Sequence, residues 1–222
     1  MSADFWQTLG LTFQLATLTT LILLFVGIPL AYWLAFAQFR AKPLAEALVS
    51  LPLVLPPTVL GFYLLIALGP NSWLGQFLYN TFNIRLVFTF SGLLLGSIIY
   101  SLPFMVQPVQ AGFQNLPKNL AEASYILGKS RFITLWKVLL PNIRPALLSG
   151  IVLAFAHTVG EFGVILMIGG NIPGETRVAS IALYDEVESL NYAAANQYAA
   201  VLVLFSLSIL LLLYASNARK FH

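Results

Sequence analysis

Five separate runs of apolar residues, each long enough to cross a bilayer as a helix, constrain this sequence more than any other feature. Hydrocarbon about 30 Å thick requires about 20 mostly apolar residues in helical form. Only 9% of the 222 residues are charged, whereas a soluble globular domain carries about 25%. The chain has too few charges to cover a water-exposed surface, which excludes a soluble enzyme, a nucleic-acid-binding domain and a disordered chain. The runs cover residues 11–36, 47–68, 88–110, 146–168 and 199–216.

These runs predict an all-α polytopic membrane protein that forms a single domain over residues 1–222. The second and fourth runs contain Pro, Gly and polar residues, so we expect five membrane-spanning helices, with a re-entrant segment or a sixth crossing as open alternatives. The leader at residues 1–10 has no Lys or Arg and the first run is longer than a signal-peptide core, so we expect no cleaved signal. The absence of cysteine excludes disulfides and thiolate metal sites.

Basic residues flank the apolar runs unevenly, and this bias predicts the orientation. Cytoplasmic loops of membrane proteins carry an excess of Lys and Arg. Only Arg85 and Arg177 fall on one side of the predicted membrane. We therefore expect the N-terminus outside and the C-terminus in the cytoplasm, as five crossings require. The basic residues on the cytoplasmic side are Arg40, Lys42, Lys118, Lys129, Arg131, Lys137, Arg144, Arg219 and Lys220.

The stretch 115–145, between the third and fourth runs, predicts two short helices at the cytoplasmic surface. Pro117 suits a first helical turn and Gly128 a helix end, while Ser130 can cap a second helix that we expect to end before Pro141. The first helix could pack on its own bundle, lie on lipid, or fit a groove on a cytoplasmic partner. Helical spacing predicts one apolar stripe formed by Leu116, Leu120, Ala123 and Leu127.

The same stretch resembles the EAA loop of ABC-importer permeases. The matching residues are Glu122-Ala123-Ser124, then Gly128, then Val138-Leu139-Leu140-Pro141, with Ser124 and Val138 as mild departures from the usual Ala and Ile. In that family the loop forms the coupling helix that docks on the ATPase subunit. The resemblance implies a type I ABC-importer transmembrane domain whose coupling loop covers residues 115–131. It also implies that Glu122, Ala123, Ser124 and Gly128 lie at the ATPase contact.

Two further segments are similar to molybdate permeases. One is Leu51-Pro-Leu-Val-Leu-Pro-Pro-Thr-Val-Leu-Gly61; the other is Val159-Gly-Glu-Phe-Gly163 followed by Gly170-Asn-Ile-Pro-Gly-Glu-Thr-Arg177. The resemblance implies a molybdate importer subunit, with tungstate as a second substrate, in a bacterial or archaeal cytoplasmic membrane. It implies a homodimer, a cytoplasmic ATPase dimer that holds ATP and Mg²⁺, an external periplasmic or lipid-anchored binding protein, and no cofactor on this chain. Sulfate and thiosulfate permeases are close relatives and remain the alternative.

The prolines of the second run predict a break beside the transport path. Pro52, Pro56 and Pro57 remove backbone donors inside a span, which membranes tolerate only where protein or a water-filled cavity satisfies the freed groups. Thr58 adds a hydroxyl. We expect Pro56, Pro57 and Thr58 to border the translocation path or its gate, with a simple packing kink as the alternative.

His157 and Glu161 are the ionisable residues of the fourth run, four positions apart and so predicted to share a helix face. Ionisable residues inside a membrane indicate a functional site. A bare carboxylate would repel an anion, so we expect Glu161 to be paired, protonated or hydrogen-bonded to backbone, with Gly160 and Gly163 allowing close approach. Its expected role is to fix a bend or a gate.

The remaining polar and small residues of the third run have less specific interpretations. Ser101 and Gln107 either line a conduit or bond to a neighbouring helix. Gly92 and Gly96 favour tight helix contact, either within the chain or between two copies. Five spans can hardly enclose a polar conduit alone, whereas two copies could.

The sequence gives only weak support for other classes of function. Gly128-Lys129-Ser130 looks like the end of a P-loop, but Ala123 occupies the position of its first glycine and no strand pattern precedes it. A proton-coupled carrier would use His157 and Glu161 as a relay. A membrane-embedded enzyme would have to use the acidic cluster at residues 185–188 for catalysis. That cluster fits the solvent-exposed face of a helix better than a catalytic site.

Overall fold

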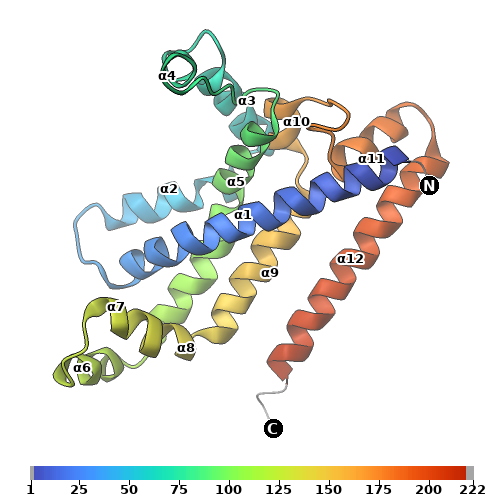
Figure 1. Ribbon diagram of the computed structural model, residues 1–222. Coiled ribbons are helices and arrows are strands. Elements are labelled where there is room, and N and C mark those ends of the chain that lie inside the picture. Colours follow the sequence, from blue (N-terminus) through green and yellow to red (C-terminus); the bar gives the residue numbers. More distant parts are fainter. Residues whose placement is uncertain (1–2, 219–222) are drawn as a thin grey trace.

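The computed structural model describes residues 3–218, and over that range every regular element is a helix (Figure 1). Three helices are long and apolar enough to cross a membrane by themselves: α1 (Ala3–Phe36), α5 (Phe90–Gln114) and α12 (Tyr192–Ala218). Two sharply bent segments, 42–68 and 131–160, pass the same test of length and composition. Counting each bent segment as one span gives up to five, the number of apolar runs, although the segment 131–160 begins and ends before the run at 146–168 does.

The core lies where α1, α5 and α9 (Arg144–Gly160) pack along one another. A Cβ atom at Gly27 of α1 would lie 2.8 Å from Cγ of Met105 on α5, so the two helices approach more closely there than most side chains would permit. The α12 helix packs on α11 (Ala179–Glu188) and α9, yet Val203, Leu204 and Leu211 are exposed. An apolar face of this kind suits lipid contact.

The second apolar run is broken as its prolines predicted. Helix α2 (Lys42–Val54) ends before the extended residues Leu55 and Pro56, and α3 (Pro57–Leu68) begins immediately after them, bent by 110° from α2. Pro56 and Pro57 lack the N–H groups that a continuous helix would require at these positions. The break therefore costs the chain fewer hydrogen bonds than it would if these two residues had N–H groups.

The fourth run is not one continuous helix, which corrects the sequence-based prediction for residues 146–168. Helix α9 ends at Gly160 and α10 (Gly163–Gly169) begins three residues later. Glu161 has extended backbone angles, with φ −65° and ψ 134°. The hydroxyl of Ser180, on α11, donates to the carbonyl oxygen of Glu161 at 2.5 Å and so satisfies a group that a helix would otherwise have used.

The stretch after α5 forms the expected pair of short helices. Helix α6 (Lys118–Ile126) is followed by Gly128 with φ +73°, and Ser130 caps α7 (Arg131–Thr134) by accepting from the N–H of Ile133 at 3.3 Å. The second helix does not end before Pro141, however. It continues through a π-helical segment, η1 (Leu135–Leu139), into α8 (Leu140–Asn142), where Pro141 stands in the first turn and needs no donor.

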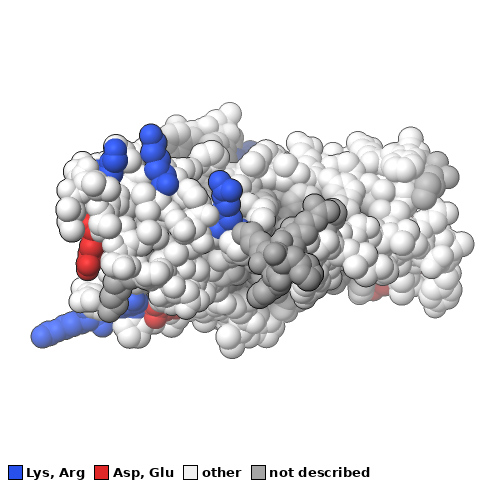
Figure 2. Space-filling view, turned by 90° about the horizontal axis from the view of Figure 1, so that it is seen from below, with Lys and Arg blue, Asp and Glu red and all other residues white. Residues whose placement is uncertain are grey.

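Charged residues separate toward two ends of the molecule. The α1–α2 loop and α6 to α8 occupy the left and lower left of Figure 1, and Figure 2 shows Lys and Arg side chains gathered on that half of the face seen from below. At the upper right, Arg177 contacts Asp185 at 2.9 Å, Glu186 at 3.6 Å and Asp4 at 3.8 Å. Arg219 and Lys220, which the orientation prediction also used, lie outside the described residues.

Two glycines bring α3 and α10 into direct contact. A Cβ at Gly163 would lie 2.6 Å from Cβ of Pro57 and 3.3 Å from the backbone nitrogen of Thr58, while one at Gly61 would lie 2.7 Å from Cβ of Met167. Gly160, in contrast, has no atom within 4 Å of an added Cβ. The expectation of close approach is therefore confirmed for Gly163 and wrong for Gly160 within one chain.

We expect Gly163→Ala to destabilise the protein by about 1–3 kcal/mol, because the new methyl group would overpack the contact with Pro57. The matched control is Gly160→Ala, which adds the same methyl group to open space and gains helix propensity. Thermal unfolding of both variants in the same detergent measures the difference. Equal melting temperatures would contradict the close α3–α10 contact.

Candidate functional site

The two helix breaks face each other across one cavity of about 480 Å³. Its lining includes Pro57 and Thr58 from the start of α3, His157 from α9, Glu161 from the second break, and Tyr100 from α5. Four of the five residues predicted to border a path or gate therefore lie together, although their segments are about a hundred positions apart in sequence. The fifth, Pro56, is the residue before α3, and its carbonyl accepts from the N–H of Val59 at 2.9 Å.

His157 is held in place by both hydrogen bonding and ring packing. Its Nδ1 atom lies 3.0 Å from the hydroxyl oxygen of Ser101, which is itself 2.9 Å from the hydroxyl of Thr158. The imidazole stacks on Phe104, with ring centroids 3.9 Å apart, and contacts Tyr100 at 4.7 Å. The half-buried ring is therefore fixed in orientation at the cavity wall.

Glu161 does not share a helix face with His157, which corrects the sequence-based prediction. The i, i+4 spacing brings two side chains together only on a continuous helix, and α9 ends at Gly160. Glu161 stands in the extended break, with its backbone carbonyl bonded to Ser180 and its backbone N–H 3.4 Å from the carbonyl of Thr158. Its main chain is thus tied to two neighbouring segments, which suits the expected role of fixing a bend.

The carboxyl group of Glu161 is enclosed by protein. The residue is 3% exposed, and neither carboxyl oxygen has a hydrogen-bond partner among residues 3–218. The hydroxyl of Ser97 is also buried and lies near this carboxyl group, but no hydrogen bond of normal geometry joins the two. An ionised carboxylate without a partner is costly in such surroundings. We therefore expect the neutral acid at this position.

The cavity offers polar groups without a fixed charge. The lining includes the hydroxyl-bearing residues Thr58 and Tyr100 and the imidazole of His157, and the described lining contains no Lys, Arg or Asp. The start of α3 adds the N–H of Thr58, which points out of a 12-residue helix at its positive end. Neutral donors of this kind can replace part of the hydration shell of an anion without holding it as a permanent countercharge would.

The sequence did not single out Tyr100 or Ser180, and no signal in it joins them to the cavity. Tyr100 belongs to an unbroken apolar run, and Ser180 lies in a loop-and-helix segment outside every run. Gln107, a predicted conduit candidate, instead donates to the hydroxyl of Ser50 at 2.9 Å and ties α5 to α2. A Cβ at Gly96 would lie 3.3 Å from Val164, so this glycine serves a contact within the chain.

A second candidate site is the exposed tip formed by α6 and the turn after it. Glu122, Ala123 and Gly128 are exposed, whereas Ser124 is 5% exposed and its hydroxyl lies 2.9 Å from that of Thr134 on α7. Ser124 therefore joins the two short helices and cannot reach a partner directly. The prediction of a single apolar stripe along α6 is wrong. Leu116 and Leu120 pack on the core, while Ala123 is exposed and Leu127 is 75% exposed.

Comparison with known proteins gives consistent matches over most of the chain. A family model described as "Binding-protein-dependent transport system inner membrane component" matches residues 27–222. The chain is 48% identical over 210 residues to "Molybdenum transport system permease protein ModB" of Azotobacter vinelandii, covering 95% of this chain and 93% of that protein. It is 35% identical to the protein of the same name in Escherichia coli (strain K12), covering 83% of this chain and 80% of that protein.

A sulfate transport protein is also similar to this chain. "Probable sulfate transport system permease protein cysT" of Chlorella vulgaris is 38% identical over 211 residues, covering 95% of this chain and 79% of that protein. This identity lies between those of the two molybdenum permeases, so percentage identity alone does not separate the two kinds of relative.

Solved structures identify the fold. A bacterial alginate ABC transporter, in complex with an alginate pentasaccharide-bound periplasmic protein, aligns with a TM-score of 0.79 at 18% identity, covering 99% of this chain and 80% of that one. The MetNI methionine ABC transporter aligns with a TM-score of 0.71 at 18% identity, covering 97% of each chain. The all-helical fold is that of an ABC-importer transmembrane domain, as the sequence motifs implied.

We expect Glu161→Gln to leave the free energy of unfolding at neutral pH within about 1 kcal/mol of the unsubstituted protein, because Gln keeps the shape of a neutral carboxyl group. Glu161→Lys, which buries a cation in the same place, should destabilise by several kcal/mol. Thermal unfolding in detergent compares the two. A large loss of stability in Glu161→Gln would show that the carboxylate is ionised and has a cationic partner, for example from a second copy of the chain.

Proposed function

Because this chain belongs to the binding-protein-dependent transport system inner membrane components, we propose that it is the permease subunit of an ATP-driven importer of molybdate, with tungstate as a second substrate. It is a multi-pass protein of the inner membrane, and a partner subunit hydrolyses ATP. The observation that carries the proposal of molybdate is the similarity to a molybdenum permease along nearly the whole of both chains.

The cavity between the two helix breaks supports passage of a tetrahedral dianion. Such an ion enters a membrane protein only if polar groups replace its hydration shell. Thr58, Tyr100 and His157 offer donors, and a neutral Glu161 would avoid repulsion. A path built from neutral groups binds the ion weakly enough to release it, which conduction requires. We propose that five residues form the gate of this path: Pro56, Pro57, Thr58, His157 and Glu161.

Two copies of the chain would complete the path. Gly160 is exposed on the cavity wall and has open space beside it, and α2 and α3 expose large apolar side chains, including Leu48, Val54 and Tyr63. A second copy packed across these helices would close the open side of the cavity by a two-fold axis, the commonest symmetry of protein oligomers. We propose a homodimer on this ground.

The basic end of the molecule supports an orientation with the N-terminus outside and α6 in the cytoplasm. Arg40, Lys129 and Arg131 lie in the α1–α2 loop and the α6–α7 segment, where the positive-inside rule favours the cytoplasm. In this orientation the exposed tip of α6, with Ile126 86% exposed and Leu127 75% exposed, faces a cytoplasmic ATPase dimer. An external binding protein would meet the opposite end.

Sulfate is the second candidate substrate, supported by the 38% identity to a sulfate permease. Both ions are tetrahedral dianions, so the neutral donors of the cavity do not distinguish them by charge. Selection in this proposal belongs to the binding protein, which delivers one ion to the outer end of the path.

We expect ATP-dependent uptake of labelled molybdate by proteoliposomes that contain this chain, its ATPase and its binding protein. An equal concentration of tungstate should compete and an equal concentration of sulfate should compete at least tenfold less well. Uptake by this chain alone, driven by a pH gradient, would contradict the proposal and support a proton-coupled carrier that uses His157 and Glu161.

We expect Glu122→Pro to abolish association with the ATPase, because proline in the interior of α6 costs about 3 kcal/mol and the helix has only nine residues. Glu122→Ala removes the same carboxylate and keeps the helix, so it should retain most of the association. Co-purification of the ATPase with each variant measures the effect. If both variants co-purify like the unsubstituted chain, α6 is not the coupling helix.

A further inference from the structure

A separate cavity of about 410 Å³ lies behind α6, between the end of α1 and the α6–α7 segment. Its lining combines aromatic rings from the last turns of α1 with Tyr125 of α6 and Arg131 of α7. It shares no residue with the cavity at the helix breaks. The lining residues are Tyr32, Trp33, Phe36, Ala37, Ala121, Tyr125, Arg131 and Leu139.

The polar groups of this cavity form one donor cluster. Tyr32, Tyr125 and Arg131 all line this cavity, so its wall carries two phenol groups and one guanidinium group. Arg131 carries five N–H donors in a planar fork that matches the oxygens of a phosphate group. The described lining contains no Asp or Glu, so nothing on this wall competes with an incoming anion. The cluster therefore suits a singly charged phosphate diester.

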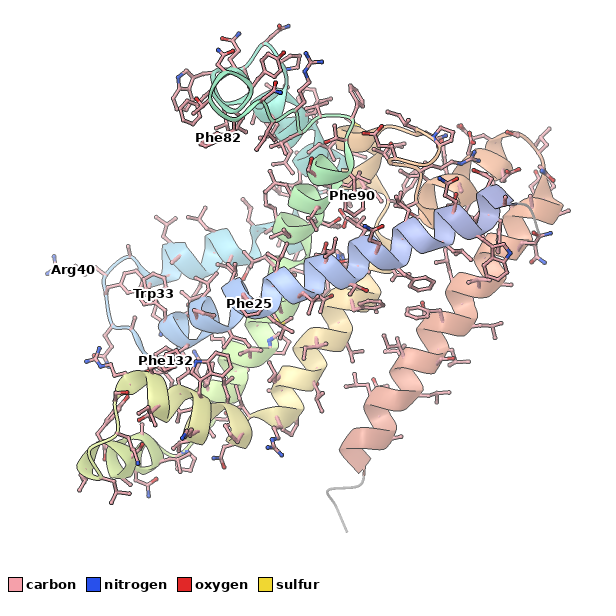
Figure 3. All side chains as sticks on the ribbon, in the orientation of Figure 1. Phe25, Trp33, Arg40, Phe82, Phe90 and Phe132 are labelled. Atoms are coloured by element: carbon pink, nitrogen blue, oxygen red, sulfur yellow. The ribbon has the colours of Figure 1, made fainter. Side chains whose placement is uncertain are left out.

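The apolar part of the cavity lies at the C-terminal end of α1. Trp33 is 46% exposed and stacks on Phe39 with ring centroids 4.8 Å apart, while Phe36 is 45% exposed. Figure 3 places Trp33, Arg40 and Phe132 at the same corner of the molecule, on α1, the α1–α2 loop and α7. Aromatic rings beside basic residues are typical of the level at which lipid headgroups meet the hydrocarbon.

We propose that this cavity binds the phosphate group of an anionic phospholipid from the cytoplasmic leaflet. Arg131 and the two tyrosine hydroxyls hold the phosphate, and Trp33 and Phe36 contact the glycerol and the first methylene groups. A soluble oxyanion would use only the donor cluster, whereas a phospholipid uses both parts of the lining. The exposed aromatic rings therefore favour the lipid.

A lipid in this cavity would lie beside α6, the proposed coupling helix. Ala121 and Tyr125 belong to α6, so a lipid in the cavity touches the helix that we propose docks on the ATPase. The lipid would hold α6 against the end of α1 and stiffen the coupling segment. The inference concerns lipid binding and does not depend on which oxyanion is transported.

The test measures lipid binding to the full-length chain, purified in detergent and stripped of lipid, by native mass spectrometry. Phosphatidylglycerol and phosphatidylcholine with the same acyl chains are titrated separately. We expect tighter binding of phosphatidylglycerol, and a loss of about tenfold in its affinity in Arg131→Gln, as for a charge-assisted hydrogen bond. Lys137→Gln is the matched control, because Lys137 is an exposed cation on the neighbouring η1 and does not line the cavity.

Tyr32→Phe provides a second variant with little risk to folding, since it keeps the ring contact with Phe113 at 5.6 Å. It should weaken phosphatidylglycerol binding about threefold, the effect of one neutral hydrogen bond. Three results would overturn the proposal. These are equal losses in Arg131→Gln and Lys137→Gln, no preference over phosphatidylcholine, or competition by inorganic phosphate as strong as by phosphatidylglycerol.

Discussion

Hydrogen bonding of the backbone inside a membrane is the constraint on which this structure depends. Hydrocarbon offers no partner to a free N–H or C=O group, so a helix can be interrupted there only where the chain itself supplies replacements. The protein interrupts two of its spans, at Leu55–Pro56 and at Glu161–Phe162. In the first, prolines remove the donors; in the second, the hydroxyl of Ser180 bonds the freed carbonyl. Pro57 and Thr58, which follow the first break, and Glu161 of the second line one cavity.

The packing around that cavity explains why small and hydroxyl-bearing residues gather there. Gly163 and Gly61 allow α3 to contact α10 directly, and Ser101 links the side chains of His157 and Thr158. These contacts are short and specific, so the cavity wall is rigid even though the helices that form it are broken. A rigid wall with neutral donors is compatible with passage of an anion, whereas a fixed cation would retain it.

The end of the molecule formed by α6, α7 and α8 is held together differently. Its short helices are held by few groups: the Ser124–Thr134 hydrogen bond, the Ser130 cap, and the packing of Leu116 and Leu120 on the core. The outer surface of α6 remains exposed and apolar, with Ile126 and Leu127 free of contacts that would bury them. Under the proposed function, this segment passes movement of the ATPase to the helices on which it packs, and the proposed lipid binds beside it.

The sequence by itself determined the membrane class, the number of apolar runs, the break at the prolines, the cap at Ser130 and the helix end at Gly128. Each of these follows from local chemistry, since hydrophobicity, a missing N–H or a glycine backbone acts within a few residues. The tertiary structure alone decided that Pro57 and His157 line one cavity, that Glu161 leaves its helix, and that the stripe on α6 divides between core and surface. The hydroxyl of Ser180 bonds the carbonyl of Glu161, and the ring of Tyr100 packs on His157. Both partners are distant in the sequence, and no periodicity records which distant group will satisfy a freed carbonyl or cover a side chain.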